Sequence, residues 1–302
     1  MFGNGNHPEV TVTTTTSKRR KGSWPFLFLA LLFVFAVFLS WYFTWFGREL
    51  SDANISTYLA DERHPRRVQH ALLQVQQRIE RGDGSGRQWY PQLLNLASSP
   101  ETEFRLTVAW LMGFDRESPE FHQALLKLLA DSEPVVRRNA ALALVRFGDA
   151  SGRPELDAIL QPYAVQAKTS GTVASTLRPG SQISRGTLLA RVEQAGETSE
   201  IRSPLPGKIE NVLVSPNSTL SPGDQVVTIQ SDETSIWEAL RALSLVGRED
   251  DLALVERFSK TLPGLSERIL KQASLTASSI RARMGSKTQV GGAGGASGSE
   301  MP

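Results

Sequence analysis

Residues 121–149 read FHQALLKLLADSEPVVRRNAALALVRFGD, a stretch with the apolar spacing of two consecutive helices. The first helix has a leucine-rich face formed by Leu125, Leu126, Leu128 and Leu129. The second has apolar residues at the i, i+4, i+8 and i+11 positions of one face, which are Val136, Ala140, Leu144 and Phe147. Pro134 suits the first turn of the second helix, and Gly148 is a typical C-terminal residue. The stretch therefore predicts a helix–turn–helix unit.

Related units precede this one in the chain. Three short strings recur with spacings of 37 and 33 residues: Leu59-Ala60-Asp61, Leu96-Ala97-Ser98 and Leu129-Ala130-Asp131. A proline follows each string within a few residues, at Pro65, Pro100 and Pro134. Repeats of this period are typical of helical solenoids, in which stacked units share a continuous core. We therefore predict helical repeats over residues 52–162.

These units resemble HEAT repeats, including the short type related to phycobilin lyases. The matching residues are acid–base pairs six positions apart, Asp61 with Arg67 and Asp131 with Arg137. The resemblance implies that such residues form a hydrogen-bonded ladder between neighbouring repeats. The middle unit departs from the pattern, with Ser98 in place of the acid and Arg105 seven positions later, so the ladder is expected to break there. No bilin-binding cleft is recognisable, and lyase activity is not inferred.

A duplicated β segment follows the helical repeats. RPGSQISRGTLLARV (178–192) aligns without gaps to SPNSTLSPGDQVVTI (215–229), and Gly180 is matched by Asn217, which also tolerates positive φ. This match predicts a shared left-handed turn. Upstream, residues 171–173 match 207–209 at an offset one residue smaller, so one half has an extra residue, which we assign to a bulge. Two such short halves predict an intertwined two-sheet sandwich over residues 163–231.

The β segment resembles the barrel-sandwich hybrid of biotinyl/lipoyl domains, through SGTV (170–173), GTLLARVE (186–193) and SPLPGKI (203–209). In that family, biotin or lipoate is attached to a lysine on the hairpin that links the halves. The corresponding link, residues 194–199, contains no Lys, so we predict no biotin or lipoyl attachment. The hybrid also occurs in periplasmic adaptor (membrane-fusion) proteins of export pumps. Those proteins commonly insert a long helical hairpin where this chain has only the short link.

Helical periodicity returns over residues 234–284. This part resembles one more HEAT-like pair with a capping helix. Two arrangements remain open: the β segment is inserted into one solenoid whose two parts pack together, or residues 234–284 form a separate three-helix domain. The Gly/Ser-rich residues 285–302 are predicted to be a disordered tail.

The N-terminal part of the chain is strongly apolar. Residues 24–46 contain no charged side chain and follow the basic cluster Lys18–Lys21, whereas residues 1–23 are polar and are predicted to be disordered. This pattern predicts a single transmembrane helix over 24–46. The basic cluster predicts a cytoplasmic N-terminus in the inner membrane, with residues 47–302 periplasmic or otherwise extracytoplasmic.

Composition excludes several kinds of chemistry. The chain has no cysteine and only four histidines, so thiol catalysis, disulfides and zinc ribbons are excluded and no metal site is predicted. Outside the N-terminal cluster, basic and acidic residues nearly balance, which disfavours a nucleic-acid partner. Gly82–Gly86 has the wrong order for a nucleophile elbow, and no phosphate-binding glycine loop occurs. We therefore predict no catalytic, cofactor-binding or metal-binding residues.

The sequence thus predicts a multidomain chain of one transmembrane helix, an α-helical HEAT-like solenoid, a small all-β domain and further C-terminal helices. Its expected function is that of a non-enzymatic, membrane-anchored scaffold or adaptor that binds unidentified protein partners in a bacterial envelope complex. The alternative is an accessory adaptor subunit of an export system, with a transporter as partner, and an enzyme ranks third. Oligomeric state distinguishes the first two, because an export conduit is expected to form a closed ring.

Overall fold

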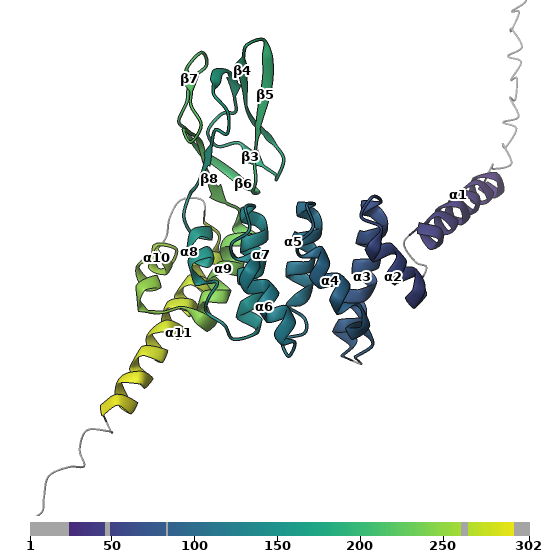
Figure 1. Ribbon diagram of the computed structural model, residues 1–302, viewed down its shortest axis with the longest axis horizontal. Helices are drawn as coiled ribbons and strands as arrows, with labels where there is room; N and C mark the ends of the chain where they lie inside the picture. The colour runs from purple at the N-terminus through teal and green to yellow at the C-terminus, as the bar shows by residue number, and fades with distance from the viewer. Residues whose placement is uncertain (1–23, 46–48, 83, 261–264, 293–302) are drawn as a thin grey trace, which may run out of the picture. The chain divides into compact units, whose positions relative to one another are not determined.

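A computed structural model describes residues 24–45, 49–82, 84–260 and 265–292 of the chain (Figure 1). The chain divides into two units, residues 1–49 and residues 50–302, and each is considered by itself. The predicted tail at 1–23 lies outside the described residues, as does the last part of the tail, residues 293–302. Residues 285–292, which were predicted to be disordered, are instead the end of a helix.

The described part of the first unit is one helix, α1 (Trp24–Trp45). Its described side chains are almost all exposed, and those of Trp41 and Trp45 lie outside the description. A helix needs roughly 20 consecutive apolar residues to cross a bilayer. Over the part of the chain that the structure describes, no helix is both long enough and apolar enough to do so. In α1 the continuous run of described side chains covers only residues 24–40. The predicted transmembrane helix, and the fold class that included it, are therefore wrong. The fold is a mixture of helical repeats and antiparallel sheets.

The second unit begins with helices that alternate between two layers (Figure 1). The A layer contains α2 (Asp52–Ala60), α4 (Tyr90–Leu96), α6 (Pro119–Leu128) and α8 (Arg153–Ile159), and the short η1 (Ser85–Trp89) precedes α4. The B layer contains α3 (Pro65–Arg81), α5 (Thr102–Met112), α7 (Pro134–Arg146) and α9 (Glu233–Val246). The last part of the chain forms η2 (Glu249–Asp251), α10 (Leu252–Arg257) and α11 (Glu267–Gly292), and α11 packs on α9.

Local sequence signals explain where several of these helices begin. Proline occupies the first turn of α3, α6 and α7, where its missing N–H leaves no broken hydrogen bond. Ser118 caps α6 by accepting a hydrogen bond from the Phe121 N–H at 3.2 Å. Asp232 caps α9 in the same way, through the Ser235 N–H at 2.8 Å. The helix starts are therefore fixed by short-range chemistry that is visible in the sequence.

The β segment is inserted into the turn between α8 and α9, the A–B turn of the fourth helix pair. A single apolar core joins residues on either side of the insertion, including Leu156 and Ile159 of α8, Leu240 of α9 and Ile269 of α11. The structure thus shows the first of the two arrangements that the sequence left open: one helical stack continues past the β segment.

The inserted segment, here called the β module (163–231), contains two four-stranded antiparallel sheets. One sheet has the order β1-β8-β6-β3 and the other β5-β4-β2-β7. The strands are β1 (Tyr163–Gln166), β2 (Gly171–Thr176), β3 (Gln182–Ile183), β4 (Leu188–Gln194), β5 (Glu197–Arg202), β6 (Gly207–Val212), β7 (Thr219–Leu220) and β8 (Gln225–Ser231). The short strands are exchanged between the halves, because β3 pairs with β6 and β7 pairs with β2. The predicted intertwined sandwich is confirmed.

Equivalent positions in the two halves have equivalent backbone geometry. Gly180 and Asn217 have φ values of 83° and 68°, so the predicted left-handed turn is present twice. Gly171 and Gly207 also match: each lies so close to the neighbouring strand that a Cβ atom would collide with it. The predicted bulge does not explain the extra residue, because β2 and β6 both have a register shift at the equivalent place. The extra residue instead lies in the loop between β6 and Asn217.

Candidate interaction surface

The B layer carries a groove of about 330 Å³ that crosses three consecutive helices, α5, α7 and α9. Its lining residues include Trp110, Asn139, Leu142, Arg146, Arg241 and Leu245. We call this feature the B-layer groove. Because it spans successive repeats, it depends on the stacking of the repeats and not on any one helix.

Large apolar side chains are exposed along the same layer. Trp110 on α5 is 40% exposed and Leu245 on α9 is 65% exposed. Leu73 on α3 is 48% exposed, and it lies one helical turn after Gln69, whose side chain hydrogen-bonds to Thr107 of α5 at 3.3 Å. Because Trp110 lies one turn after Thr107, Leu73 and Trp110 extend a common apolar face. Exposed apolar groups gathered in this way are typical of protein-binding surfaces.

Aromatic contacts hold the Trp110 end of the groove in place. The Trp110 ring packs edge-on against Phe114, with the ring centroids 4.7 Å apart. The Arg146 guanidinium lies over the other ring of this pair, 4.6 Å from the Phe114 centroid. Asn139 of α7 donates a hydrogen bond to the Leu106 carbonyl of α5 at 3.3 Å, which ties the two helices together beside the groove. The exposed indole is therefore positioned before any partner binds.

The charges of the groove are mainly positive. Arg146 and Arg241 both line it, together with the single acid Glu238. Burial raises the pKa of Glu238, and Asp232 adds to the rise, while Arg241, Arg146 and Arg268 oppose it. Arg241 also lies 5.5 Å from the Trp237 ring centroid, and Arg268 lies 4.1 Å from it on the same indole. The groove thus combines apolar contacts with two cations.

A hydrogen-bonded ladder joins the second and third repeats along the A–B turns. Arg105 donates from Nε to Asp131 at 2.6 Å and from Nη2 to the same carboxylate at 3.1 Å, and both side chains are largely buried. Arg105 also donates to the backbone carbonyl of Ser99 at 2.8 Å. Burial alone would raise the pKa of Asp131. The Arg105 hydrogen bonds and the Glu133 N–H outweigh burial and hold that pKa below its usual range.

The expected break in the ladder at Arg105 is therefore wrong. Ser99, not Ser98, occupies the position of Asp131, because each accepts a hydrogen bond from the N–H two residues later. Arg105 then stands six residues after Ser99, as Arg137 stands six after Asp131. The next contact along the ladder runs from Arg137 to Glu155 of α8 at 2.7 Å.

The first repeat departs from the ladder. Arg67 pairs with Asp61 of its own repeat at 3.1 Å, and both side chains are partly exposed. The contact to the next repeat is made instead by Ser99, which donates to Glu62 at 2.6 Å.

The sequence analysis missed a second set of links at the opposite turns. The Tyr90 hydroxyl donates to Asp115 at 2.6 Å, and His122 Nε2 lies 2.6 Å from Asp149. Burial raises the pKa of Tyr90, and the Asp115 carboxylate reinforces the rise. Asp115 and Asp149 each follow a Phe/Gly pair, which is the signal that could have identified them.

The link between the halves of the β module is the β4–β5 hairpin. Its tip is Ala195-Gly196, with φ values of 52° and 84°. The residues on either side, Gln194 and Glu197–Ser199, belong to the strands. The flanking lysines stand elsewhere: Lys208 is on β6, and Lys168 lies between β1 and β2. Within the described ranges, no group of three or more His, Cys, Asp or Glu side chains could hold a metal ion.

Comparison with known proteins supports the helical part. A family model of HEAT repeats matches residues 90–167, which covers α4 to α8 and β1. The solved structure of a single-chain, multi-domain long-chain acyl-CoA carboxylase is 22% identical to the matched part, with a TM-score of 0.23. That match covers 34% of this chain and 10% of the carboxylase. No curated protein matches the chain. The chain therefore contains HEAT repeats together with a β domain.

Proposed function

We propose that this protein is a non-enzymatic scaffold whose HEAT repeats bind another protein through the B-layer groove. The observation that carries the proposal is the exposed apolar groove across α5, α7 and α9, at the centre of which Trp110 is held by Phe114. HEAT-type solenoids bury their core between repeats and leave one face free for extended contacts.

The chemistry of the groove favours one kind of partner. Trp110 and Leu245 offer apolar contacts, while Arg146 and Arg241 offer positive charge. The complementary ligand is an amphipathic helix that presents a row of apolar side chains flanked by carboxylates. Aromatic and arginine side chains are also the residue types that most often dominate interface energetics.

We also propose that the β module is a biotinyl/lipoyl-like domain without a cofactor, and that it helps to place the scaffold in a larger envelope assembly. The exchange of β3 and β7 between the duplicated halves supports the first part. The missing lysine in residues 194–199 supports the absence of an attached group. The export-adaptor alternative predicts a closed ring, which sedimentation of the purified chain would reveal.

The test is a cross-linking pull-down from the source cells with the tagged full-length chain. Proteins that bind the groove should be recovered with the wild type and should fall about tenfold or more with Trp110→Glu, because a hot-spot aromatic contributes about 2 kcal/mol or more. Leu213→Glu is the matched control, because Leu213 is also a half-exposed apolar residue but lies in the β module. Equal loss or equal recovery in the two variants would contradict the proposal.

A further inference from the structure

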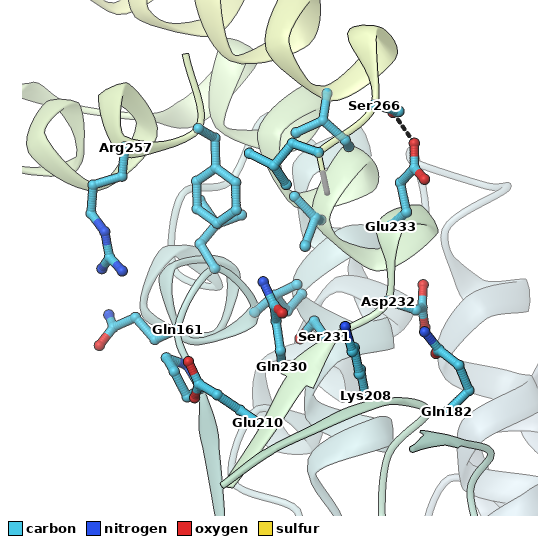
Figure 2. Close-up of a pocket in the computed structure, with 17 residues that line it drawn as sticks. Gln161, Gln182, Lys208, Glu210, Gln230, Ser231, Asp232, Glu233, Arg257 and Ser266 are labelled. Carbon is cyan, nitrogen blue, oxygen red and sulfur yellow. Dashed lines mark hydrogen bonds between the residues drawn. The ribbon is translucent and has the colours of Figure 1, made fainter. Parts of the chain in front are cut away.

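A second cavity lies where the β module meets the C-terminal helices, and it shares no lining residue with the B-layer groove. Its volume is about 440 Å³, within the range of small-ligand sites. One wall is the β1-β8-β6-β3 sheet, and the others are the end of α8, the starts of α9 and α11, and the end of α10 (Figure 2). We call it the junction cleft.

Apolar side chains form part of the cleft. Ile159 of α8, Ile236 of α9, Phe258 after α10 and Ile269 of α11 all line it. These residues belong to the core that joins the two parts of the helical stack. The cleft wall is therefore set by a packed core, which makes its shape a fixed property of the fold.

The charges that the cleft offers to a ligand are positive. Lys208 on β6 and Arg257 on α10 come from opposite walls, and among the described residues neither side chain makes a hydrogen bond or ion pair (Figure 2). The acids of the cleft are already engaged. Asp232 caps α9, Glu233 accepts a hydrogen bond from Ser266, and Glu210 accepts one from Thr228 at 3.3 Å.

A buried hydroxyl in the wall also lacks a partner. Ser231, at the end of β8, is only 6% exposed, and within the described part of the chain its Oγ atom makes no hydrogen bond. Figure 2 places Ser231 between Gln230 and Asp232 on the wall that faces Phe258 and Ile269. A buried polar group without a partner costs roughly 1–3 kcal/mol, so this hydroxyl indicates a polar ligand that completes the site.

We propose that the junction cleft binds a carboxylate joined to a compact apolar group. The carboxylate lies between Lys208 and Arg257 and takes a hydrogen bond from Ser231, while the apolar group packs on Phe258 and Ile236. This chemistry is shared by the C-terminus of a peptide ending in an apolar residue and by a free branched or aromatic acid. It is a site separate from the proposed protein-binding groove.

The test is calorimetric titration of the full-length chain with three probes: N-acetyl-leucine, N-acetyl-leucinamide, and the peptide acetyl-Gly-Gly-Leu with a free carboxyl group. The acid should bind about tenfold or more tightly than the amide, because only the acid forms charge-assisted hydrogen bonds. Tighter binding of the peptide than of N-acetyl-leucine would identify a chain terminus as the source. Equal binding of the two carboxylates would identify a small acid. Equal binding of acid and amide, or no binding of either, would overturn the proposal.

Variants locate the site. Lys208→Gln and Arg257→Gln should each weaken binding of the acid about tenfold, whereas Ser231→Ala should weaken it several-fold without loss of stability. Lys168→Gln is the matched control, because Lys168 is another exposed lysine of the β module and does not line the cleft. Trp110→Glu should leave this binding unchanged, which separates the failure of one site from the failure of the other. Wild-type affinity in all the cleft variants would overturn the proposal.

Discussion

The Arg105 guanidinium joins two repeats, and its contribution can be compared with that of a similar pair elsewhere. The Arg105–Asp131 side chains are 12% and 7% exposed, whereas those of the Arg67–Asp61 pair are 53% and 24% exposed. Removing one member of a buried pair leaves the other charge without compensation, but an exposed pair contributes little. The two arginines therefore test the same interaction in two environments.

We expect Arg105→Ala to lower the free energy of unfolding by about 3 kcal/mol, and Arg67→Ala by less than about 1 kcal/mol. Urea denaturation of the two variants measures both values. Because Arg105 lowers the pKa of Asp131, the stability from this pair is complete above the ordinary carboxyl pKa and is lost as the pH falls through the lowered one. Equal effects of the two substitutions would show that the ladder does not hold the repeats together.

A carboxyl pair at α8 predicts the opposite dependence on pH. Burial, together with the nearby Asp251, raises the pKa of Asp157 to about 7. Asp251 is itself buried, and it accepts a hydrogen bond from the Arg248 N–H at 2.6 Å and lies 3.4 Å from Arg153. A carboxyl group with a raised folded-state pKa binds more protons in the native state, so stability falls as the pH rises from about 4 to 7.

Asp157→Asn removes this titration. We expect the variant to gain stability relative to the wild type between pH 5 and pH 8, because the wild type then acquires a second buried negative charge beside Asp251. Denaturant unfolding of both proteins at the two pH values measures the difference. A difference that stays constant with pH would contradict the shifted pKa.

At the scale of the element, the two glycines that begin β2 and β6 control how closely the strands approach. A Cβ atom on Gly207 would collide with the Gln230 carbonyl oxygen and with the Ile229 side chain of β8. Gly285, on the last exposed turns of α11, has no such neighbour. Gly207→Ala should therefore destabilise the β module by about 1–3 kcal/mol, while Gly285→Ala should be neutral or slightly stabilising. Thermal unfolding compares the two, and a stable Gly207→Ala variant would contradict the predicted strand packing.

Elements with a strong local signal could be predicted from the sequence. The helices that begin with Pro65 and Pro134, and the paired turns at Gly180 and Asn217, follow from residue type and spacing. The ladder was misplaced by one residue, because Ser98 and Ser99 are adjacent and only the hydrogen bond to the Glu101 N–H distinguishes them. The B-layer groove was not predicted at all, since it brings together residues from three repeats and depends on how the repeats stack.

At the scale of the whole second unit, the helical stack does not depend on the β module for its continuity. Leu156 and Ile159 pack in one core with Leu240 and Ile269, although the β module separates them in sequence. Replacing residues 163–231 with a short glycine-rich linker should therefore leave the helices folded, with one cooperative helical melting transition by circular dichroism. Loss of residues 233–285 from the folded core would show that the helices on either side of the insertion are independent.

The central claim is that the B-layer groove binds a protein partner, and cross-linking from inside the groove tests it most directly. A photoreactive amino acid would replace Leu245 in the full-length chain, and a second chain would carry it at Leu275, an exposed leucine of α11 that does not line the groove. The account predicts that position 245 cross-links to a discrete partner, that position 275 does not, and that Arg146→Glu abolishes the product. The same products from both positions, or a product unaffected by Arg146→Glu, would contradict it.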